Sequence, residues 1–242
     1  MRIATWNVNH RVGRVRFQPD AAHAVADLDA DVLVLTEYFP QQQHEKFANT
    51  LVAGGWEAPL LSREPLERAN RVLITARAPL ELVELPLPEH DEQFPANMLA
   101  VKVANNSLTI LGIRVPYYSG DSQEHLRQSW DWLEATAGKM VSRPSVIVGD
   151  LNVRLDSPKR RCGDAFRRIL QSGWRRAQPV GPGGFMKHGS HSEIDHLLAS
   201  AQCEVKNARY ITVDGGFNLA GTSDALSDHA ALVADVVAYH AA

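Results

Sequence analysis

The sequence predicts a single globular domain that combines a mixed β-sheet with helices, and three observations lead to this prediction. The chain has 242 residues, 45% apolar and 22% charged, so it can bury a large core; this composition argues against a disordered, collagen-like or disulfide-stapled protein. It opens with a strand, a helix and a strand, which is typical of a parallel pair. Its later strands are joined by short turns, which is typical of antiparallel hairpins.

The opening segment predicts a β-α-β unit. An apolar run at 2–8 gives the first strand, and a helix near 20–28 begins at Pro19-Asp20, because proline suits the first helical turn. Asp31 precedes the continuous apolar run 32–36, which is typical of a buried parallel strand.

The remaining elements follow from periodicity and from turn signals. Eight further strands are expected near 71–76, 80–85, 98–104, 107–115, 145–150, 194–199, 207–213 and 230–238. Three further helices are expected near 41–53, 121–140 and 164–172, with glycine stops at Gly54-Gly55 and Gly173. Asn105-Asn106 is expected to form the turn of a hairpin.

The chain is expected to form one domain, residues 1–242, because it shows no fixed repeat and no long linker. Its first residues do not resemble an export signal, and no apolar run approaches the roughly 18 residues that span a bilayer. Cys162 and Cys203 stand in no metal-ligand spacing and are interpreted as reduced thiols. We expect a cytoplasmic monomer without a membrane span.

Positive charge is concentrated in one segment of an otherwise acidic chain. Nine Lys or Arg residues and two acidic residues lie between Arg154 and Lys187, a net charge of +7 that leaves −10 for the rest of the chain. The basic strip 154–187 is either a surface for a polyanion such as DNA or a solvated helix face.

Polar side chains follow the apolar strands at the points where the strands end. They lie in Trp6-Asn7-Val8-Asn9, at Glu37, at Arg114, in Gly149-Asp150-Leu151-Asn152, in Ile194-Asp195-His196 and in Ser227-Asp228-His229. Strand ends are where open sheets build sites. Each residue alone is also compatible with a turn, a cap or a solvated charge, but their recurrence after successive apolar runs favours a shared site.

The chemical types in this set favour a hard divalent cation. Carboxylates and amides predominate, with one imidazole and no cysteine, which suits Mg²⁺ or Mn²⁺ and does not suit zinc. Such a cation takes one or two protein carboxylates and leaves its other positions to water and substrate phosphate.

Taken together and in order, these motifs resemble the endonuclease/exonuclease/phosphatase superfamily, which includes exonuclease III and pancreatic deoxyribonuclease. The resemblance runs from residue 3 to about 237 and so covers essentially the whole chain. It implies an α+β fold: a four-layer α/β sandwich of two packed mixed, mostly antiparallel sheets, flanked by helices.

The resemblance also implies roles for these residues in metal-assisted hydrolysis of a phosphoester. Glu37 would hold the cation with Asn9 close by, and Asp228 would lie beside the metal. Asp150 would orient and deprotonate the attacking water, held by Asn7.

Four further roles complete the implied site. Asn152 would donate to a phosphate oxygen or position the nucleophile. Asp195 would orient the His229 imidazole and favour its charged form, so that the ring meets the charge developing on phosphate. Arg114 would donate to phosphate oxygens, with a surface salt bridge as the alternative.

Three functions remain open at this point. We expect a DNA nuclease, with RNA as a further substrate class, whose basic strip contacts the nucleic-acid backbone. The alternative is a phosphatase or phosphodiesterase that acts on a small or lipid-derived phosphoester, favoured by the acidic balance and by the lack of an aromatic stripe. A binding module without catalysis is disfavoured, because an inactive site has no physical need to keep Glu37, Asp150 and His229. The segment around Glu37 lacks the Gln and Thr-Lys of many DNA-repair members, and the loop before Asp195 lacks their tryptophans.

Overall fold

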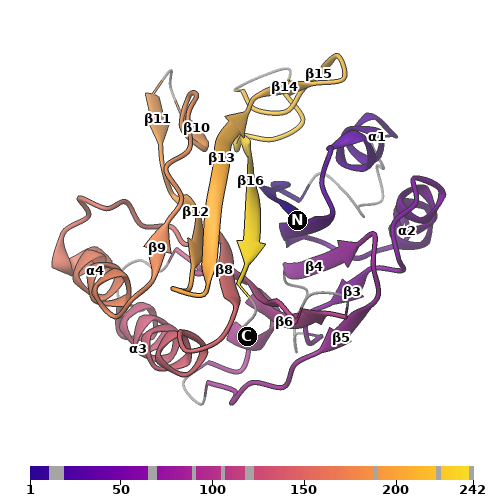
Figure 1. Ribbon diagram of the computed structural model, residues 1–242. Coiled ribbons are helices and arrows are strands. Elements are labelled where there is room, and N and C mark those ends of the chain that lie inside the picture. Colours follow the sequence, from indigo (N-terminus) through magenta and orange to yellow (C-terminus); the bar gives the residue numbers. More distant parts are fainter. Residues whose placement is uncertain are drawn as a thin grey trace.

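A computed structural model describes residues 1–10, 19–64, 70–88, 91–104, 107–117, 123–187, 190–221 and 225–239. Two six-stranded sheets face each other, with two helices outside each sheet, so the chain has the four-layer sandwich that the resemblance implied (Figure 1). The expected α+β fold is thereby confirmed.

The first sheet has the order β13-β16-β1-β2-β4-β3. Its strands are β1 (Arg2–Asn7), β2 (Val32–Tyr38), β3 (Leu60–Leu61), β4 (Arg71–Ala76), β13 (Cys203–Ile211) and β16 (Ala231–Ala238). The pair β1–β2 is parallel, as the β-α-β opening predicted, and the other pairs are antiparallel.

The second sheet has the order β5-β6-β7-β8-β12-β9. Its strands are β5 (Leu80–Leu82), β6 (Met98–Val103), β7 (Thr109–Arg114), β8 (Ser145–Asp150), β9 (Arg175–Arg176) and β12 (Asp195–Ala199). Only β7–β8 is a parallel pair. The expected β6–β7 hairpin is present, whereas its turn at Asn105-Asn106 lies outside the described residues.

Three buried apolar clusters hold the layers together. The largest lies between the sheets and consists of aliphatic side chains such as Val34, Ile110 and Leu232. Helices α1 (Pro19–Asp27) and α2 (His44–Ala53) cover the outer face of the first sheet, and α3 (Gln123–Met140) and α4 (Gly163–Gln171) cover that of the second. Each fully buried aliphatic side chain contributes about 1.5–3 kcal/mol, so this packing fixes the sheets against each other.

Short elements at the edges were not predicted from the sequence. They are the edge strands β3 and β9 of the two main sheets, the hairpin strands β10 (Phe185–Lys187) and β11 (Ser190–Ser192), the hairpin strands β14 (Val213–Asp214) and β15 (Phe217–Asn218), and the 3-10 turns η1 (Phe94–Asn97) and η3 (Lys159–Arg161). Two- and three-residue strands are too short to show an alternation of apolar and polar residues.

The strand directions bring the polar motifs to one end of the sandwich. The C-terminal ends of β1 and β2 meet the N-terminal end of antiparallel β16, and the C-terminal ends of β7 and β8 meet the N-terminal end of β12. In the described ranges, none of the helices combines the length and hydropathy needed to cross a bilayer.

Candidate active site

The two sheets are joined at this end by a hydrogen bond between side chains. Asn7, the last residue of β1, donates from Nδ2 to Oδ2 of Asp150, the last residue of β8, at 3.0 Å. Both residues are buried. The motif at the end of each strand therefore faces the other motif across the interface of the sheets.

Asp150 is a fully buried carboxylate held by two amides. Besides the bond from Asn7, it accepts the backbone N–H of Asn152 on Oδ1 and the Asn152 side chain on Oδ2, both at 3.0 Å. Burial, with the charge of Asp195 in addition, raises the pKa of Asp150 to about 6. A carboxylate with this pKa can accept a proton near neutral pH.

The residue before Asp150 must be a glycine, because the backbone at position 149 leaves no room for a side chain. Its φ is +141°, and a Cβ at this position would lie 2.0 Å from the backbone oxygen of Ile113 on the neighbouring strand β7. Any side chain would separate β7 from β8 where Asp150 begins its turn into the site.

His229 lies opposite Asp150 and is paired with Asp195. Its Nδ1–H donates to Oδ2 of Asp195 at 2.8 Å, and both side chains are buried. Burial alone would lower the pKa of His229, but the charge of Asp195 and this hydrogen bond outweigh burial and raise it to about 9. The imidazole is therefore positively charged at neutral pH. Asp150 can accept a proton at the same pH, so the two groups have opposite roles although both pKa values are raised.

Several neighbours fix the position of His229. The Ser227 hydroxyl donates to the backbone oxygen of Asn7 and accepts the N–H of His229, while the Trp6 indole donates to the backbone oxygen of His229 at 2.7 Å. The Phe185 ring lies 4.9 Å from the imidazole, centroid to centroid. At Gly184 a Cβ would lie 2.5 Å from Oδ2 of Asp195, so this glycine leaves room for the carboxylate.

Glu37 is aimed into the site by an irregularity in β2. The register with β4 shifts between Leu35 and Tyr38, and Glu37 has a φ of +54°. Bulges of this kind redirect a side chain from the sheet toward a site.

Two side chains, Arg114 and His10, hold the Glu37 carboxylate. Arg114 donates to Oε1 from Nε at 3.0 Å and from its terminal nitrogen at 2.9 Å, and His10 Nε2 lies 3.0 Å from Oε2. Burial alone would raise the pKa of Glu37, but the His10 hydrogen bond and the Arg114 charge lower it to about 2. The carboxylate is thus ionised at neutral pH.

The donor set around Glu37 fits a hard cation by chemical type. Asn9 Nδ2 donates to Oδ1 of Asp228 at 2.9 Å, which places a second carboxylate beside an amide oxygen on the same loop as His10. Within the described ranges, no group of three or more His, Cys, Asp or Glu side chains is arranged so that it could hold a metal ion by itself. Magnesium does not require such a group, since one or two carboxylates with water and phosphate oxygens satisfy it.

The structure brings the expected site residues into two groups at the same end of the sandwich. One group contains Asn7, Asp150, Asn152, Asp195 and His229; the other consists of two pairs, Glu37 with Arg114 and Asn9 with Asp228.

The structure gives Asn152 and Arg114 partners within the site, and one neighbour was missed in the sequence. Asn152 donates its amide N–H groups to Asp150 and to the backbone oxygen of Val115, and Arg114 forms an ion pair with Glu37. His10, which binds Glu37, directly follows the Trp6–Asn9 motif; this adjacency was the available signal.

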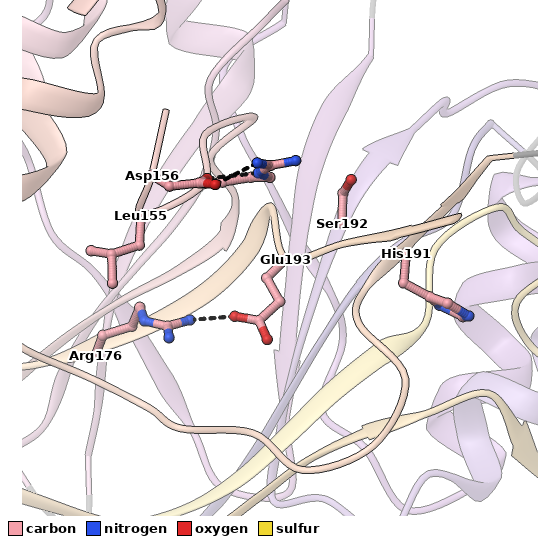
Figure 2. A pocket seen from close by; sticks show the side chains of 7 residues that line it. Leu155, Asp156, Arg176, His191, Ser192 and Glu193 are labelled. Atoms are coloured by element: carbon pink, nitrogen blue, oxygen red, sulfur yellow. Dashed lines mark hydrogen bonds and ion pairs between the residues drawn. The ribbon is translucent and has the colours of Figure 1, made fainter. Parts of the chain in front are cut away.

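A pocket of about 420 Å³ is lined by residues of the segments that follow β8 and precede β12 (Figure 2). Its lining includes Arg154 and Arg176, which are paired with Asp156 and Glu193, so positive and negative side chains balance. Ile194, next to Glu193, accepts the N–H of Leu151, which follows Asp150. The chain segments that line the pocket are therefore joined next to Asp150 along the sequence, and the lining does not present excess positive charge.

Most of the basic strip is similarly occupied by internal contacts. Arg168 binds Glu134 and Asp164, Arg167 donates to the backbone oxygens of Leu155 and Ser157, and Arg175 donates to those of Ala201 and Cys203. Within the described residues, Lys159, Arg160 and Arg161 have no ion pair. Turn η3 is thus a part of the strip whose cations are not paired with carboxylates in the described residues; Arg167 and Arg175 also lack a carboxylate partner but are held by backbone oxygens.

Comparison with known proteins gives one family match and many structural ones. The model of the Endonuclease/Exonuclease/phosphatase family matches residues 4–229. Comparison with curated protein sequences gives no match.

Three solved structures illustrate the likeness of the fold. A 3'-5' exonuclease from Neisseria meningitidis is 22% identical, with a TM-score of 0.70 over 97% of this chain and 99% of that chain. A 3' phosphatase from Neisseria bound to product DNA hairpin is 23% identical, with a TM-score of 0.72 over 97% and 98%. An AP endonuclease from Archaeoglobus fulgidus is 20% identical, with a TM-score of 0.70 over 97% and 98%.

Proposed function

Because the chain belongs to the endonuclease/exonuclease/phosphatase family, whose members are phosphoester hydrolases, we propose that it is a divalent-metal-dependent nuclease that hydrolyses phosphodiester bonds of DNA. The observation that carries this proposal is the buried cluster in which Asn7 and Asn152 hold Asp150 while Asp195 holds His229. In this cluster the pKa of Asp150 is about 6 and that of His229 about 9. One group can accept a proton and the other can donate hydrogen bonds to an anion at the same pH.

The reaction follows from this pair. Asp150 takes a proton from water while the water oxygen attacks phosphorus in line with the leaving oxygen. The P–O bond to the leaving group breaks as the new P–O bond forms. His229 donates its free Nε2–H to a phosphoryl oxygen and so stabilises the charge that develops there.

Asn7 and Asn152 hold Asp150 for this step, and Asp195 holds and charges His229. Glu37, with Asn9 and Asp228, would hold Mg²⁺ or Mn²⁺. The cation supplies a Lewis acid that neutralises phosphoryl and leaving-group oxygens. Arg114 lies beside Glu37, and its guanidinium would donate to phosphate oxygens there.

DNA is the proposed substrate for two reasons. The basic turn η3 lies on the loop that follows Asp150, and a structurally similar protein from Neisseria was solved bound to a DNA hairpin product. The second candidate is a phosphatase or phosphodiesterase for a small phosphoester, which the internal pairing of most strip arginines favours.

The test uses two substrates in parallel: supercoiled plasmid and bis(p-nitrophenyl) phosphate, each with Mg²⁺ or Mn²⁺ and with EDTA. The proposal expects metal-dependent nicking that is greatly weakened in Glu37→Gln. Tyr239→Ala, at the opposite end of β16, is the control and retains nicking. Cleavage of the small diester with the plasmid left intact would replace the nuclease with the second candidate, and no metal-dependent cleavage of either substrate would refute both.

A further inference from the structure

An exposed tyrosine stands on the rim of the candidate active site. Tyr117 lies three residues after Arg114, and 57% of its surface is exposed. The backbone oxygen of Val115, two residues before it, accepts a hydrogen bond at 2.9 Å from Asn152, which also holds Asp150. Two residues of chain span at most about 7 Å, so the ring stands within a nucleotide's reach of the Asp150 cluster.

This tyrosine is joined to the unneutralised part of the basic strip. The Arg161 guanidinium of η3 lies over the Tyr117 ring, 4.3 Å from its centroid, and also donates to the Tyr117 hydroxyl. The two side chains come from different loops, one after β7 and one after β8. Arg114 is the last residue of β7, directly before the first of these loops, and Asn152 lies on the second.

Together the stacked Arg161 and Tyr117 side chains form a flat surface that carries positive charge. The guanidinium and the ring are both planar, and both present π-faces on which a nucleobase stacks. Arg161 and its neighbours Lys159 and Arg160 have no ion pair within the described residues, so their charge is available to phosphates on either side of such a base. A tyrosine whose only role was to cover the apolar core would not require a guanidinium stacked on its exposed ring.

We propose that Tyr117 and Arg161 form a stacking platform that binds an unpaired nucleobase next to the scissile phosphate. This proposal rests on the proposed function, since it names the part of the nucleic acid that the same site recognises. A base inside a duplex is stacked on both faces, so the platform selects a single-stranded or frayed nucleotide. The contact reads a π-face and not a hydrogen-bonding edge, so sequence preference is weak.

The test measures binding with Asp150→Asn as background, so that the ligand is not cut. The probes are two fluorescent oligomers of equal length and charge: single-stranded oligothymidylate, and a chain of abasic deoxyribose phosphates. Fluorescence anisotropy gives the ratio of their dissociation constants. The platform predicts roughly 5- to 150-fold preference for the oligomer with bases.

Three added variants separate stacking from charge and from general damage. Tyr117→Ala reduces this ratio to near one, whereas Tyr117→Phe retains it, because the ring face remains. Arg161→Lys lowers the ratio while keeping the charge. Tyr239→Ala removes another exposed, hydrogen-bonded tyrosine far from the site and leaves the ratio unchanged.

The outcomes distinguish this inference from the proposed function. Plasmid nicking by the wild-type protein with a base-to-abasic ratio near one, or a ratio unaffected by Tyr117→Ala, would overturn the platform and leave the nuclease intact. A ratio that collapses in Tyr117→Ala without any nicking by the wild-type protein would support the platform and refute the nuclease.

Discussion

Two buried residues of the site have pKa values displaced upward for different reasons, and their order determines what the site can do. Asp150 is raised mainly because burial penalises its charge, whereas His229 is raised because Asp195 outweighs the effect of burial. Asp150 therefore loses its proton at a lower pH than His229 does. Over the interval between these pKa values the cluster contains a base and a cation together.

This order predicts the pH dependence of hydrolysis. Below about pH 6 Asp150 is protonated and cannot accept a proton from water; above about pH 9 His229 loses its charge. The rate on bis(p-nitrophenyl) phosphate should rise through the first value, stay level and fall through the second. Asp150→Asn and His229→Ala should each lower the rate by about 10²–10⁴, and full activity in Asp150→Asn would contradict the mechanism.

Asp195→Asn tests the cause of both shifts. Asp195 contributes to raising the pKa of Asp150 and of His229, so its neutralisation should move both limbs of the profile to lower pH and reduce the plateau less than His229→Ala does. Asp235→Asn, which removes a carboxylate on β16 that is paired with Arg2 on the neighbouring strand β1, should leave both limbs in place. Unmoved limbs in Asp195→Asn would show that the pair does not set these pKa values.

At the scale of elements, the long strands and helices could be predicted because each has a regular apolar pattern. The continuous apolar run of β2 is visible in the sequence, and so are the apolar residues of α3 that recur every three or four positions. In the structure the apolar residues of both patterns are buried. The strand predicted near 207–213 begins at Cys203 in the structure. Its first residues were not predicted because a register shift between Lys206 and Arg209 interrupts the alternation of apolar and polar residues.

The site was predictable as a set of residues but not as a network. The order of motifs along the chain identified Glu37, Asp150 and His229 as members of one site. The cross-sheet contact of Asn7 with Asp150, the bulge that aims Glu37 and the capture of Glu37 by His10 depend on backbone geometry that no residue pattern encodes. Contacts across the sandwich require the packed structure.

Gly149 gives the sharpest test of how β8 positions its terminal carboxylate. Gly149→Ala places a Cβ against the backbone of Ile113, so β7 and β8 must separate. We expect a loss of about 3 kcal/mol in the free energy of unfolding, together with a loss of hydrolysis. Urea unfolding followed by circular dichroism measures the first quantity, and initial rates measure the second.

Gly138→Ala is the matched control for that substitution. Gly138 lies inside α3, and a Cβ added there would meet no atom of the described residues within 4 Å beyond its own helix backbone and chain neighbours. Alanine should therefore stabilise the helix by about 1 kcal/mol and leave the rate unchanged. Equal effects of the two substitutions would show that the close contact of β7 with β8 is not needed.

At the scale of the whole molecule, a buried neutral histidine makes folding sensitive to acid. His196 on β12 donates from Nε2 to the backbone oxygen of Val153 at 2.7 Å, and burial lowers its pKa to about 4. The unfolded chain protonates this residue near pH 6.5, so its contribution to stability is complete above that pH and is lost as the pH falls toward 4.

His196→Gln isolates this contribution, because the amide can donate to the same carbonyl but does not titrate. Relative to this variant, the free energy of unfolding of the wild-type protein should fall by about 3 kcal/mol between pH 7 and 4. Denaturant titrations at four pH values supply the difference. A difference that stays constant with pH would mean that His196 titrates normally in the folded protein.

The distribution of charge over the molecule predicts how strongly salt weakens DNA binding. The formal charge is −3, and Arg167, Arg168, Arg175 and Arg176 of the basic strip are already bound to carboxylates or backbone oxygens. Only cations free to neutralise phosphates release counterions on binding. Turn η3 should therefore account for most of the salt dependence, although α4 and β9 carry more arginines.

Two sets of substitutions separate these regions in the Asp150→Asn background. For single-stranded DNA each phosphate contact contributes about 0.7 to the slope of log K against log salt concentration. Replacing Lys159, Arg160 and Arg161 by Gln should reduce the slope by about 2, whereas replacing Arg167, Arg168, Arg175 and Arg176 by Gln should change it by less than about 1. If the second set flattened the slope more than the first, the whole strip would be the DNA-binding surface, and the internal ion pairs would have to open when DNA binds.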